Sequence, residues 1–386
     1  MHLSLSSTSS PFKEAVKSLL LRSFRNYETL YFEVDSSLVI ITGPNGAGKT
    51  NILEALSFLI PGRGFRRSTL QEICHKDNPH YPWAVSAKMI SQGETFQIGT
   101  GLDPDALAQG NYRRLVNIQG ITHKNHSILS EYVQALWLTP QMDRLFIDGS
   151  SERRNFIDRL VFNMDPSHST RLNRYEHAVR ERMRLLKEGC THSSWLEGLE
   201  EQIATEGVAI ETSRLRLIES LKHYLMRGGG VFPEASIDLQ SSLSQWMENL
   251  PSLQVEEKFR EELTRLRKEH TESGRMTTGI QRTDLITFFV DKNMPAPLCS
   301  TGEQKALLIS LMLAAARYLS EYATGVPLLL LDEVIAHLDE KRRFALFQEL
   351  SSLNIQTWLT GTDETLFAPL VPTTRLRIAE GKIIQD

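Results

Sequence analysis

Two stretches of the sequence carry residue types that act on a bound phosphate group. A loop rich in glycine ends in Lys49 and Thr50, and an acidic pair, Asp332-Glu333, follows near the other end of the chain. Lys49 can reach the β and γ oxygens of a nucleotide, and the Thr50 hydroxyl can ligate Mg²⁺. Asp332 can hold Mg²⁺ through water, and Glu333 can orient or deprotonate an attacking water. The loop residues expected to bind nucleotide are Gly43, Pro44, Asn45, Gly46, Ala47, Gly48, Lys49 and Thr50.

The segments around these residues predict the elements that position them. A β-branched run, Leu38-Val39-Ile40-Ile41, enters the loop, and a helical pattern that ends at Pro61-Gly62 leaves it. This is the strand, loop and helix order that a phosphate-binding loop requires. The run from Val326 to Leu331 predicts a buried parallel strand that delivers Asp332 and Glu333 at its carboxyl end. The alternative to a phosphate-binding loop at Gly43 to Thr50 is a glycine-rich turn that matches the motif by chance.

A third stretch, Cys299 to Lys305, opens a helical run over Ala306 to Leu319 about thirty residues before the acidic pair. Ser300 and Gly302 at a helix N-terminus form an anion site. Directly after the acidic pair, His337-Leu338-Asp339 closes a short turn.

Taken in order, these motifs resemble the RecF family of ABC-type ATPase heads. The resemblance covers nearly the whole chain from about Val16 onward. It rests further on the segments Leu21 to Tyr27, Thr50 to Ala55, Gly62 to Arg66, Glu152 to Asp158, and Leu359 to Thr362. It implies an α/β fold: an ABC-type P-loop ATPase head with mixed sheets and an inserted short helical arm domain.

The same resemblance implies how the site works. Two heads meet head to tail in an ATP-dependent homodimer, where Ser300 and Gly302 of one chain cap the nucleotide of the other and Asp339 also contacts nucleotide. Gln141 takes the place of the glutamine loop that senses Mg²⁺ and serves catalysis together with Lys49 and Glu333; a plain surface glutamine is the alternative. ABC heads generally end the strand at 355–360 with a histidine, and this chain has Thr360-Gly361-Thr362, which leaves the γ-phosphate contact unassigned.

The implied biological role is recombinational repair and replication. The protein would bind single-stranded and gapped duplex DNA, help RecO and RecR to load RecA at gaps in the response to DNA damage, and hydrolyse ATP slowly for release, with weak stimulation by DNA. Two other interpretations use the same motifs: the head of a chromosome-structure protein of the SMC type, and a transporter ATPase subunit. The sequence has no long heptad array, and the Phe24-Arg25-Asn26-Tyr27 opening and the arm insert count against a transporter.

Composition limits the partners and the compartment. The 386 residues carry a formal net charge of −4, so a DNA partner needs a local basic patch. Candidates are Arg63, Arg66 and Arg67, and then Arg113 and Arg114. No apolar run approaches the roughly eighteen residues of a membrane span, which predicts a cytoplasmic protein without membrane contact. We expect Cys74, Cys190 and Cys299 to be free thiols, because they are odd in number and widely spaced.

Hydrophobic patterning predicts the domain order. Residues 1–12 are expected to form a disordered leader, 13–160 the first half of the head, 161–275 the helical arm, and 276–386 the second half of the head. Short alternating stretches between Trp83 and Ile121 predict an antiparallel sheet with turns at Asp103-Pro104 and Gly110-Asn111. After Pro166 the pattern becomes helical for about a hundred residues.

Overall fold

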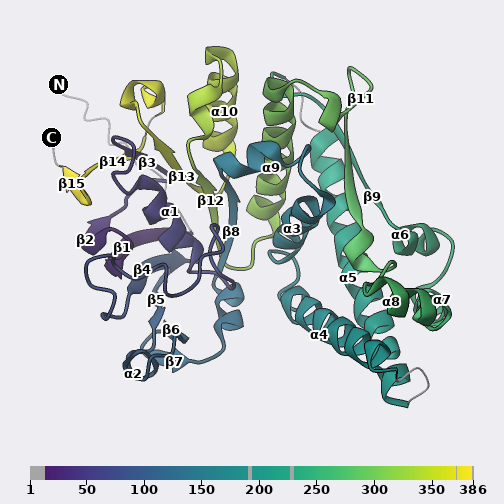
Figure 1. Ribbon diagram of the computed structural model, residues 1–386. Helices are drawn as coiled ribbons and strands as arrows, with labels where there is room; N and C mark the ends of the chain where they lie inside the picture. The colour runs from purple at the N-terminus through teal and green to yellow at the C-terminus, as the bar shows by residue number, and fades with distance from the viewer. Residues whose placement is uncertain (1–13, 190–193, 227–229, 371, 385–386) are drawn as a thin grey trace, which may run out of the picture. The chain divides into compact units, whose positions relative to one another are not determined.

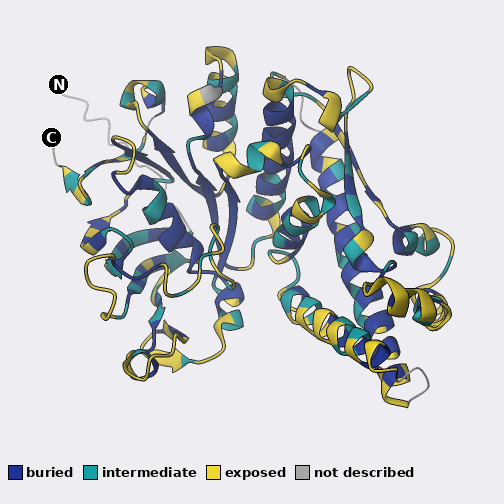
Figure 2. Ribbon diagram, in the orientation of Figure 1, coloured by how far each residue is buried: buried dark blue, intermediate teal, exposed yellow. Residues whose placement is uncertain are grey.

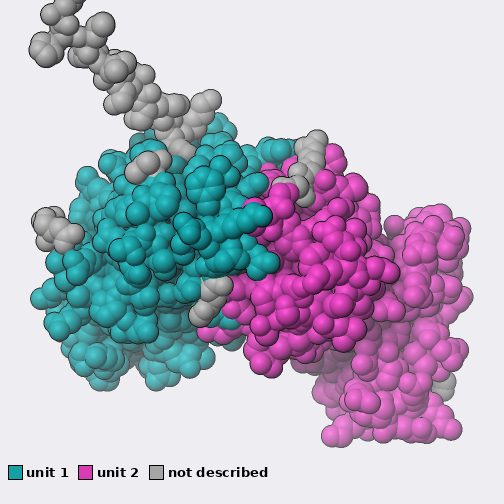
Figure 3. Space-filling view, turned by 90° about the horizontal axis from the view of Figure 1, so that it is seen from above, with its two compact units in different colours: residues 1–140, 319–386 teal, residues 141–318 magenta. Residues whose placement is uncertain are grey.

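The computed structural model describes residues 14–189, 194–226, 230–370 and 372–384. The leader expected over 1–12 lies outside these residues. The chain divides into two compact units, one formed by Met1–Pro140 with Leu319–Asp386 and the other by Gln141–Tyr318 (Figure 3). The division into head and arm at 160/161 and 275/276 stays a prediction.

A largely parallel sheet forms the centre of the first unit. Its strand order is β15-β14-β3-β13-β12-β8. The strands are β3 (Leu38–Thr42), β8 (Val133–Leu138), β12 (Val326–Leu331), β13 (Gln356–Gly361), β14 (Thr374–Ala379) and β15 (Lys382–Ile384). Every residue of β3, β8, β12 and β13 is buried (Figure 2). The apolar runs that predicted β3 and β12 therefore reflect strands covered on both faces.

Because β13 pairs with both β3 and β12, it brings the two ends of the sequence together. Leu359 pairs with Ile40 on one side and with Leu331 on the other, in parallel register on both sides. The carboxyl ends of these three strands therefore lie at one edge of the sheet. The phosphate loop and Asp332-Glu333 both follow at this edge.

An antiparallel sheet in the same unit has the strand order β2-β1-β4-β5-β6-β7. Its strands are β1 (Ala15–Phe24), β2 (Tyr27–Glu33), β4 (Ala84–Ser91), β5 (Glu94–Leu102), β6 (Arg114–Ile118) and β7 (Ile121–His123). The sheet predicted between Trp83 and Ile121 is confirmed, and both predicted turn positions lie in the connection between β5 and β6, but the two tight hairpin turns were not predicted. Asp103 caps the short helix α2 (Pro104–Ala108), and the tight hairpin turns lie at Gln92-Gly93 and Gln119-Gly120, where all four residues have positive φ.

Helices dominate the second unit. They are α3 (Ser150–Val161), α4 (His168–Lys187), α5 (Ser194–Met226), α6 (Ser242–Met247), α7 (Ser252–Arg265), α8 (Arg267–Ser273) and the first part of α9 (Thr301–Tyr322) (Figure 1). α4 packs against α5, and α5 against α7. Their apolar stripes share one buried cluster that includes Tyr175, Leu186, Ile203 and Phe259. The helical pattern predicted after Pro166 is confirmed for these helices.

The second unit also holds a small antiparallel sheet that was not predicted from the sequence. Its strand order is β11-β10-β9, with β9 at Ala235–Gln240, β10 at Asp284–Phe289 and β11 at Met294–Pro295. β9 alternates strictly between buried and exposed residues. The signal for a strand was therefore present in the sequence, inside a region whose period was otherwise helical.

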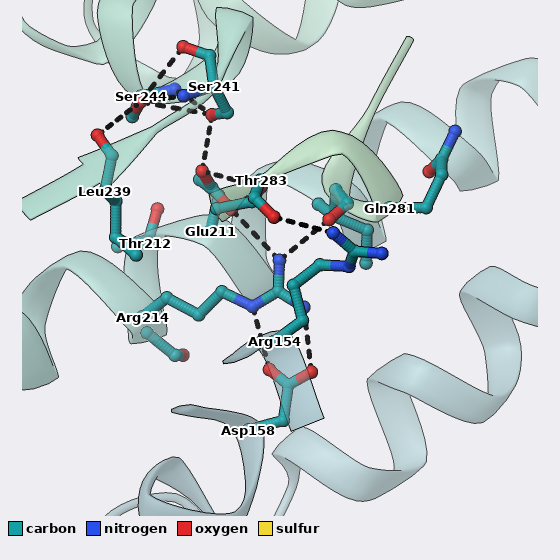
Figure 4. Close-up of polar contacts among 12 residues, drawn as sticks. Arg154, Asp158, Glu211, Thr212, Arg214, Leu239, Ser241, Ser244, Gln281 and Thr283 are labelled. Carbon is teal, nitrogen blue, oxygen red and sulfur yellow. Dashed lines mark hydrogen bonds and ion pairs between the residues drawn. The ribbon is translucent and has the colours of Figure 1, made fainter. Parts of the chain in front are cut away.

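A buried network of charged groups joins α3, α5 and the segment before β10 (Figure 4). The Arg214 guanidinium donates to both Asp158 oxygens, at 2.8 Å each, and to the Ile280 carbonyl oxygen at 3.0 Å. Glu211 accepts from Arg214 and also from the hydroxyls of Ser241 at 2.6 Å and Thr283 at 2.9 Å. Removing one member would leave a buried charge unpaired, which typically costs about 3 to 5 kcal/mol.

Two remaining expectations concern membranes and thiols. Across the described residues, no helix combines the length and apolar character needed to cross a membrane. Cys74 and Cys299 are buried free thiols, as predicted, and Cys190 lies outside the described residues.

Candidate nucleotide-binding site

Two glycines fix the path of the phosphate loop between β3 and α1 (Lys49–Ser57). Gly43 has φ 147°, and a Cβ there would lie 2.0 Å from the carbonyl oxygen of Ile378. Gly48 has φ 114°, and a Cβ there would lie 2.6 Å from both Asn26 Nδ2 and the Tyr27 hydroxyl. Both positions therefore require glycine, for conformation and for space. The loop therefore passes so close to its neighbours that a side chain at either position would clash.

Lys49 places a buried cation in this loop. Its ammonium donates to the carbonyl oxygens of Gly43 at 2.8 Å and Pro44 at 3.1 Å, and it lies 3.3 Å from Glu333 Oε1. The first turn of α1 contains no acidic residue, and no described side chain caps its N-terminus. The charge of Lys49 and the partial positive charge of the helix therefore favour an anion at the same point.

Thr50 and Asp332 meet at the edge of the sheet although 282 positions separate them. The Thr50 hydroxyl donates to Asp332 Oδ1 at 2.9 Å, and Asp332 is buried. A hydroxyl and a carboxylate oxygen side by side are the hard oxygen donors that Mg²⁺ takes. These residues fit the metal that the sequence motifs imply.

Glu333 follows in a conformation that is unusual for a residue with a side chain. It has φ 53° and ψ 24°, in the left-handed region. Its backbone N–H donates to Thr360 Oγ1 at 3.0 Å. The side chain is about a quarter exposed, at 24%, and its Oε1 lies 3.3 Å from the Lys49 ammonium.

The Phe24-Arg25-Asn26-Tyr27 opening supports the phosphate loop, a role that sequence reasoning missed. Asn26 Nδ2 donates to the Ala47 carbonyl oxygen at 3.1 Å and Asn26 Oδ1 accepts from Asn51 at 2.7 Å. Arg25 forms a two-point ion pair with the fully buried Glu54 of α1. The available signal was the polar pair Arg25-Asn26 between two aromatic residues, at the turn that joins β1 to β2.

The remaining residues predicted to contact nucleotide belong to other elements. Asp339 caps α10 (Glu340–Ser352), where its Oδ1 accepts from the Arg342 N–H at 2.8 Å. Gln141, Ser300 and Gly302 belong to the second unit, whereas Lys49 and Asp332 belong to the first. Their roles at a nucleotide stay predictions.

Within the second unit, the structure brings the start of α9 next to the segment that holds Gln141. Lys305 of α9 lies 3.1 Å from Asp143, which belongs to the same short 3-10 turn as Gln141 (Pro140–Arg144). Ser300 is exposed and donates through its N–H and its hydroxyl to Glu303 Oε2, at 2.9 Å each. Hydrogen bonds from Lys292 and Ser300 lower the pKa of Glu303 to about 2.

The arginines considered for DNA differ in exposure. Arg63, Arg66 and Arg67 are exposed on the segment after α1, although Arg66 also lies 3.1 Å from Glu54. The proposal for Arg114 is wrong, because its buried guanidinium donates to the carbonyl oxygens of Phe58, Ile60 and Gly62. Arg114 therefore anchors the end of the segment that carries the other three.

The parallel sheet, the loop at its carboxyl edge and the acidic pair beside it define an ABC-type P-loop head, which confirms the predicted fold class. The RecF/RecN/SMC N-terminal domain family matches residues 15–384. A relative from Mesorhizobium japonicum, described as DNA replication and repair protein RecF, is 41% identical over 363 residues and covers 94% of this chain and 95% of its own. A relative of the same description from Brucella suis biovar 1 is 42% identical over 365 residues, 93% of each chain. The chain belongs to the RecF family.

Solved structures agree at the level of the fold. The recombination mediator protein RecF-ATP in the RecFOR pathway superposes with a TM-score of 0.81 at 22% identity, covering 96% of this chain and 99% of that one. An Smc head domain with an extended coiled coil, from Pyrococcus furiosus, superposes with a TM-score of 0.52 at 15% identity, with 96% of each chain covered.

Proposed function

We propose that this protein is an ATP-controlled DNA-binding protein of recombinational repair and replication. The observation that carries the proposal is the meeting of Lys49, Thr50, Asp332 and Glu333 at one sheet edge, in a chain 41% identical to a DNA replication and repair protein. The nucleotide is ATP. RecO, RecR and RecA are the proposed partners, and single-stranded and gapped duplex DNA is the proposed substrate.

In this proposal each residue of the site has one task. Lys49 and the N-terminus of α1 hold the β and γ phosphates. Thr50 and Asp332 hold Mg²⁺, which neutralises charge that develops on the phosphates. Glu333 orients the water that attacks the γ-phosphate, and its partial exposure leaves room for that water.

ATP also acts as the link between two copies of the chain. Ser300 and Gly302 of one copy cap the nucleotide held by Lys49 of the other, with Gln141 and Asp339 completing the site. The γ-phosphate stabilises the closed dimer, and its hydrolysis removes that stabilisation. Slow hydrolysis, weakly stimulated by DNA, then sets how long the protein stays on DNA.

The test is to size the protein with and without ATP and gapped DNA. We expect a monomer without nucleotide, a dimer with Mg²⁺ and ATP, and a DNA-bound dimer when gapped DNA is added. A monomer under all conditions, at protein concentrations that saturate ATP binding, would contradict the proposal. If the protein keeps the same size with and without nucleotide and binds DNA equally well without ATP, it binds DNA but ATP does not control that binding.

A further inference from the structure

One hydroxyl group touches both acidic residues of the site. Thr360 is the fifth residue of β13 and is almost fully buried. Its Oγ1 lies 2.8 Å from Asp332 Oδ1 and 3.0 Å from the backbone nitrogen of Glu333. These two contacts place the hydroxyl between the residue that would hold Mg²⁺ and the residue that would orient water.

The direction of each hydrogen bond follows from its partner. A backbone N–H can only donate, so Thr360 Oγ1 accepts from Glu333. An ionised carboxylate can only accept, so the single hydroxyl hydrogen of Thr360 is directed to Asp332 Oδ1. The hydroxyl thus uses both its donor and an acceptor position on consecutive residues of another segment.

The bond to Glu333 holds a backbone conformation that is costly by itself. A residue other than glycine in the left-handed region is strained by roughly 1 to 3 kcal/mol and persists only where its surroundings hold it. At Glu333 the surroundings include Thr360, which gives the N–H of this residue its partner. The direction of the Glu333 side chain depends on that peptide.

The bond to Asp332 differs from the bond that Thr50 makes to the same oxygen. If Mg²⁺ takes the Thr50 hydroxyl as a ligand, the Thr50 hydrogen bond to Asp332 must change. Thr360 is not among the expected metal ligands, so its bond can remain and fix the carboxylate while the metal binds. Outer partners of metal-holding carboxylates have this orienting role in general.

We propose that Thr360 is a positioning residue for ATP hydrolysis, which holds Asp332 for the metal and Glu333 for the attacking water through one hydroxyl. The inference rests on the proposed function, because it assigns Thr360 to the same ATP site. A threonine that served the fold alone would affect stability and leave the metal dependence and the turnover of the folded protein unchanged.

The same strand supplies a matched control. Thr357 is also fully buried in β13, and its hydroxyl has no hydrogen-bond partner among the described residues. Thr357→Val and Thr360→Val make the same change in shape and polarity three residues apart. Only the second removes hydrogen bonds to the acidic pair.

The experiment compares the full-length parent with Thr360→Val, Thr360→Ser and Thr357→Val. It measures ATP affinity in EDTA, the Mg²⁺ concentration that half-saturates ATP binding, kcat, KM and the melting temperature. For Thr360→Val we expect unchanged ATP affinity in EDTA and, at saturating Mg²⁺, an unchanged KM. The half-saturating Mg²⁺ concentration should rise about ten-fold and kcat should fall by about ten-fold or more, because a hydrogen bond to a charged group is removed. Thr360→Ser should restore most of the Mg²⁺ dependence and most of kcat, and Thr357→Val should match the parent in both.

Three results would overturn the inference: parental kcat and Mg²⁺ dependence in Thr360→Val, equal losses in Thr357→Val, or no recovery in Thr360→Ser. If Thr360→Val does not fold, the same measurements on Thr360→Ala decide. A parent that binds no ATP would overturn the proposed function and this inference together. A parent that binds and hydrolyses ATP no better than Thr360→Val would overturn this inference alone.

Discussion

Lys49 is the only charge that the phosphate loop itself contributes, and its ammonium is already held at the loop carbonyls. We expect Lys49→Ala to abolish tight ATP binding, because the β and γ phosphates lose this cation and the neighbouring Glu333 is left without its ion pair. Equilibrium binding of labelled ATP measures the effect. Unchanged affinity would contradict the assignment of the loop.

Glu333 is expected to act after binding. Glu333→Gln keeps the shape of the side chain but removes the carboxylate that activates water, so ATP should bind and persist while turnover falls by about a hundred-fold or more. Single-turnover hydrolysis beside equilibrium binding separates the two effects. Hydrolysis at the parental rate would remove Glu333 from the reaction.

At the scale of residues, the sequence indicated which side chains meet at the sheet edge, but not the contacts that hold them there. Lys49, Thr50, Asp332 and Glu333 were identifiable because their types and the strand patterns before them are local signals. The contacts of Asn26 with Ala47 and of Thr360 with Asp332 were not, because they depend on which strands become neighbours. No pattern along the chain states that β13 lies between β3 and β12.

A buried histidine in the second unit, His270, is expected to make the stability of this unit depend on pH. His270 of α8 lies with Nδ1 3.0 Å from Arg182 Nη1, which can only donate, so a protonated ring would set one N–H against another. Burial and then the charge of Arg182 lower the pKa of His270 from 6.5 to about 4. The acidic groups that act on the ring are Glu200, Glu262 and Glu269.

Because the folded-state pKa is depressed, the unfolded chain binds the extra proton between pH 6.5 and about 4. The free energy of unfolding should therefore be independent of this group above pH 6.5 and fall below it, by up to about 2 kcal/mol near pH 5. Urea denaturation of the parent and of His270→Gln, above pH 6.5 and near pH 5, measures this change in the free energy of unfolding. The variant should lose this part of the pH slope, and an identical slope in both proteins would contradict the prediction.

The exposed segment after α1 is the element we expect to meet DNA. Replacing Arg63, Arg66 and Arg67 by alanine should weaken DNA binding and flatten its salt slope by up to about one unit for each phosphate that an arginine no longer neutralises, with ATP binding intact. Binding titrations at several salt concentrations measure the slope. The double variant Arg63→Ala/Arg67→Ala keeps the Arg66 ion pair with Glu54 and serves as its control. An unchanged slope in the triple variant would leave these residues as ordinary surface.

At the scale of elements, long periodic segments were predictable and short strands were not. α4 and α5 carry apolar stripes over many turns, and β3 and β12 are continuous apolar runs. β9 is six residues long and lies between helices, so its alternation was outweighed by the helical period around it. The Arg214 network includes contacts between residues up to 72 positions apart in the chain, and no local pattern predicts such contacts.

The whole-molecule prediction concerns sites shared between two chains. Ser300→Arg places bulk and charge where the phosphates of a partner must dock, so each chain should bind ATP without forming a dimer. Mixed with Lys49→Ala chains, it can rebuild one of two sites, where Lys49 and Ser300 are both intact. We expect ATPase activity in the mixture, up to about half that of the parent, which neither variant has alone.

Steady-state ATPase assays of each variant and of their mixtures test this sharing. Hydrolysis at the parental rate by monomeric Ser300→Arg would show that one chain contains the complete site. An inactive mixture, from variants that each fold, would contradict the shared site as well.

The order of strands in the central sheet also bears on how the protein is made. β3 is complete at Thr42, but its neighbours β13 and β14 end at Gly361 and Ala379. At typical synthesis rates, β3 emerges on the order of 20 to 70 seconds before both partners exist. The second unit is continuous from Gln141 to Tyr318, so it can fold on the ribosome while β3, an entirely buried strand, is still unpaired. A nascent chain stalled before β13 would expose this apolar strand to chaperones and to aggregation.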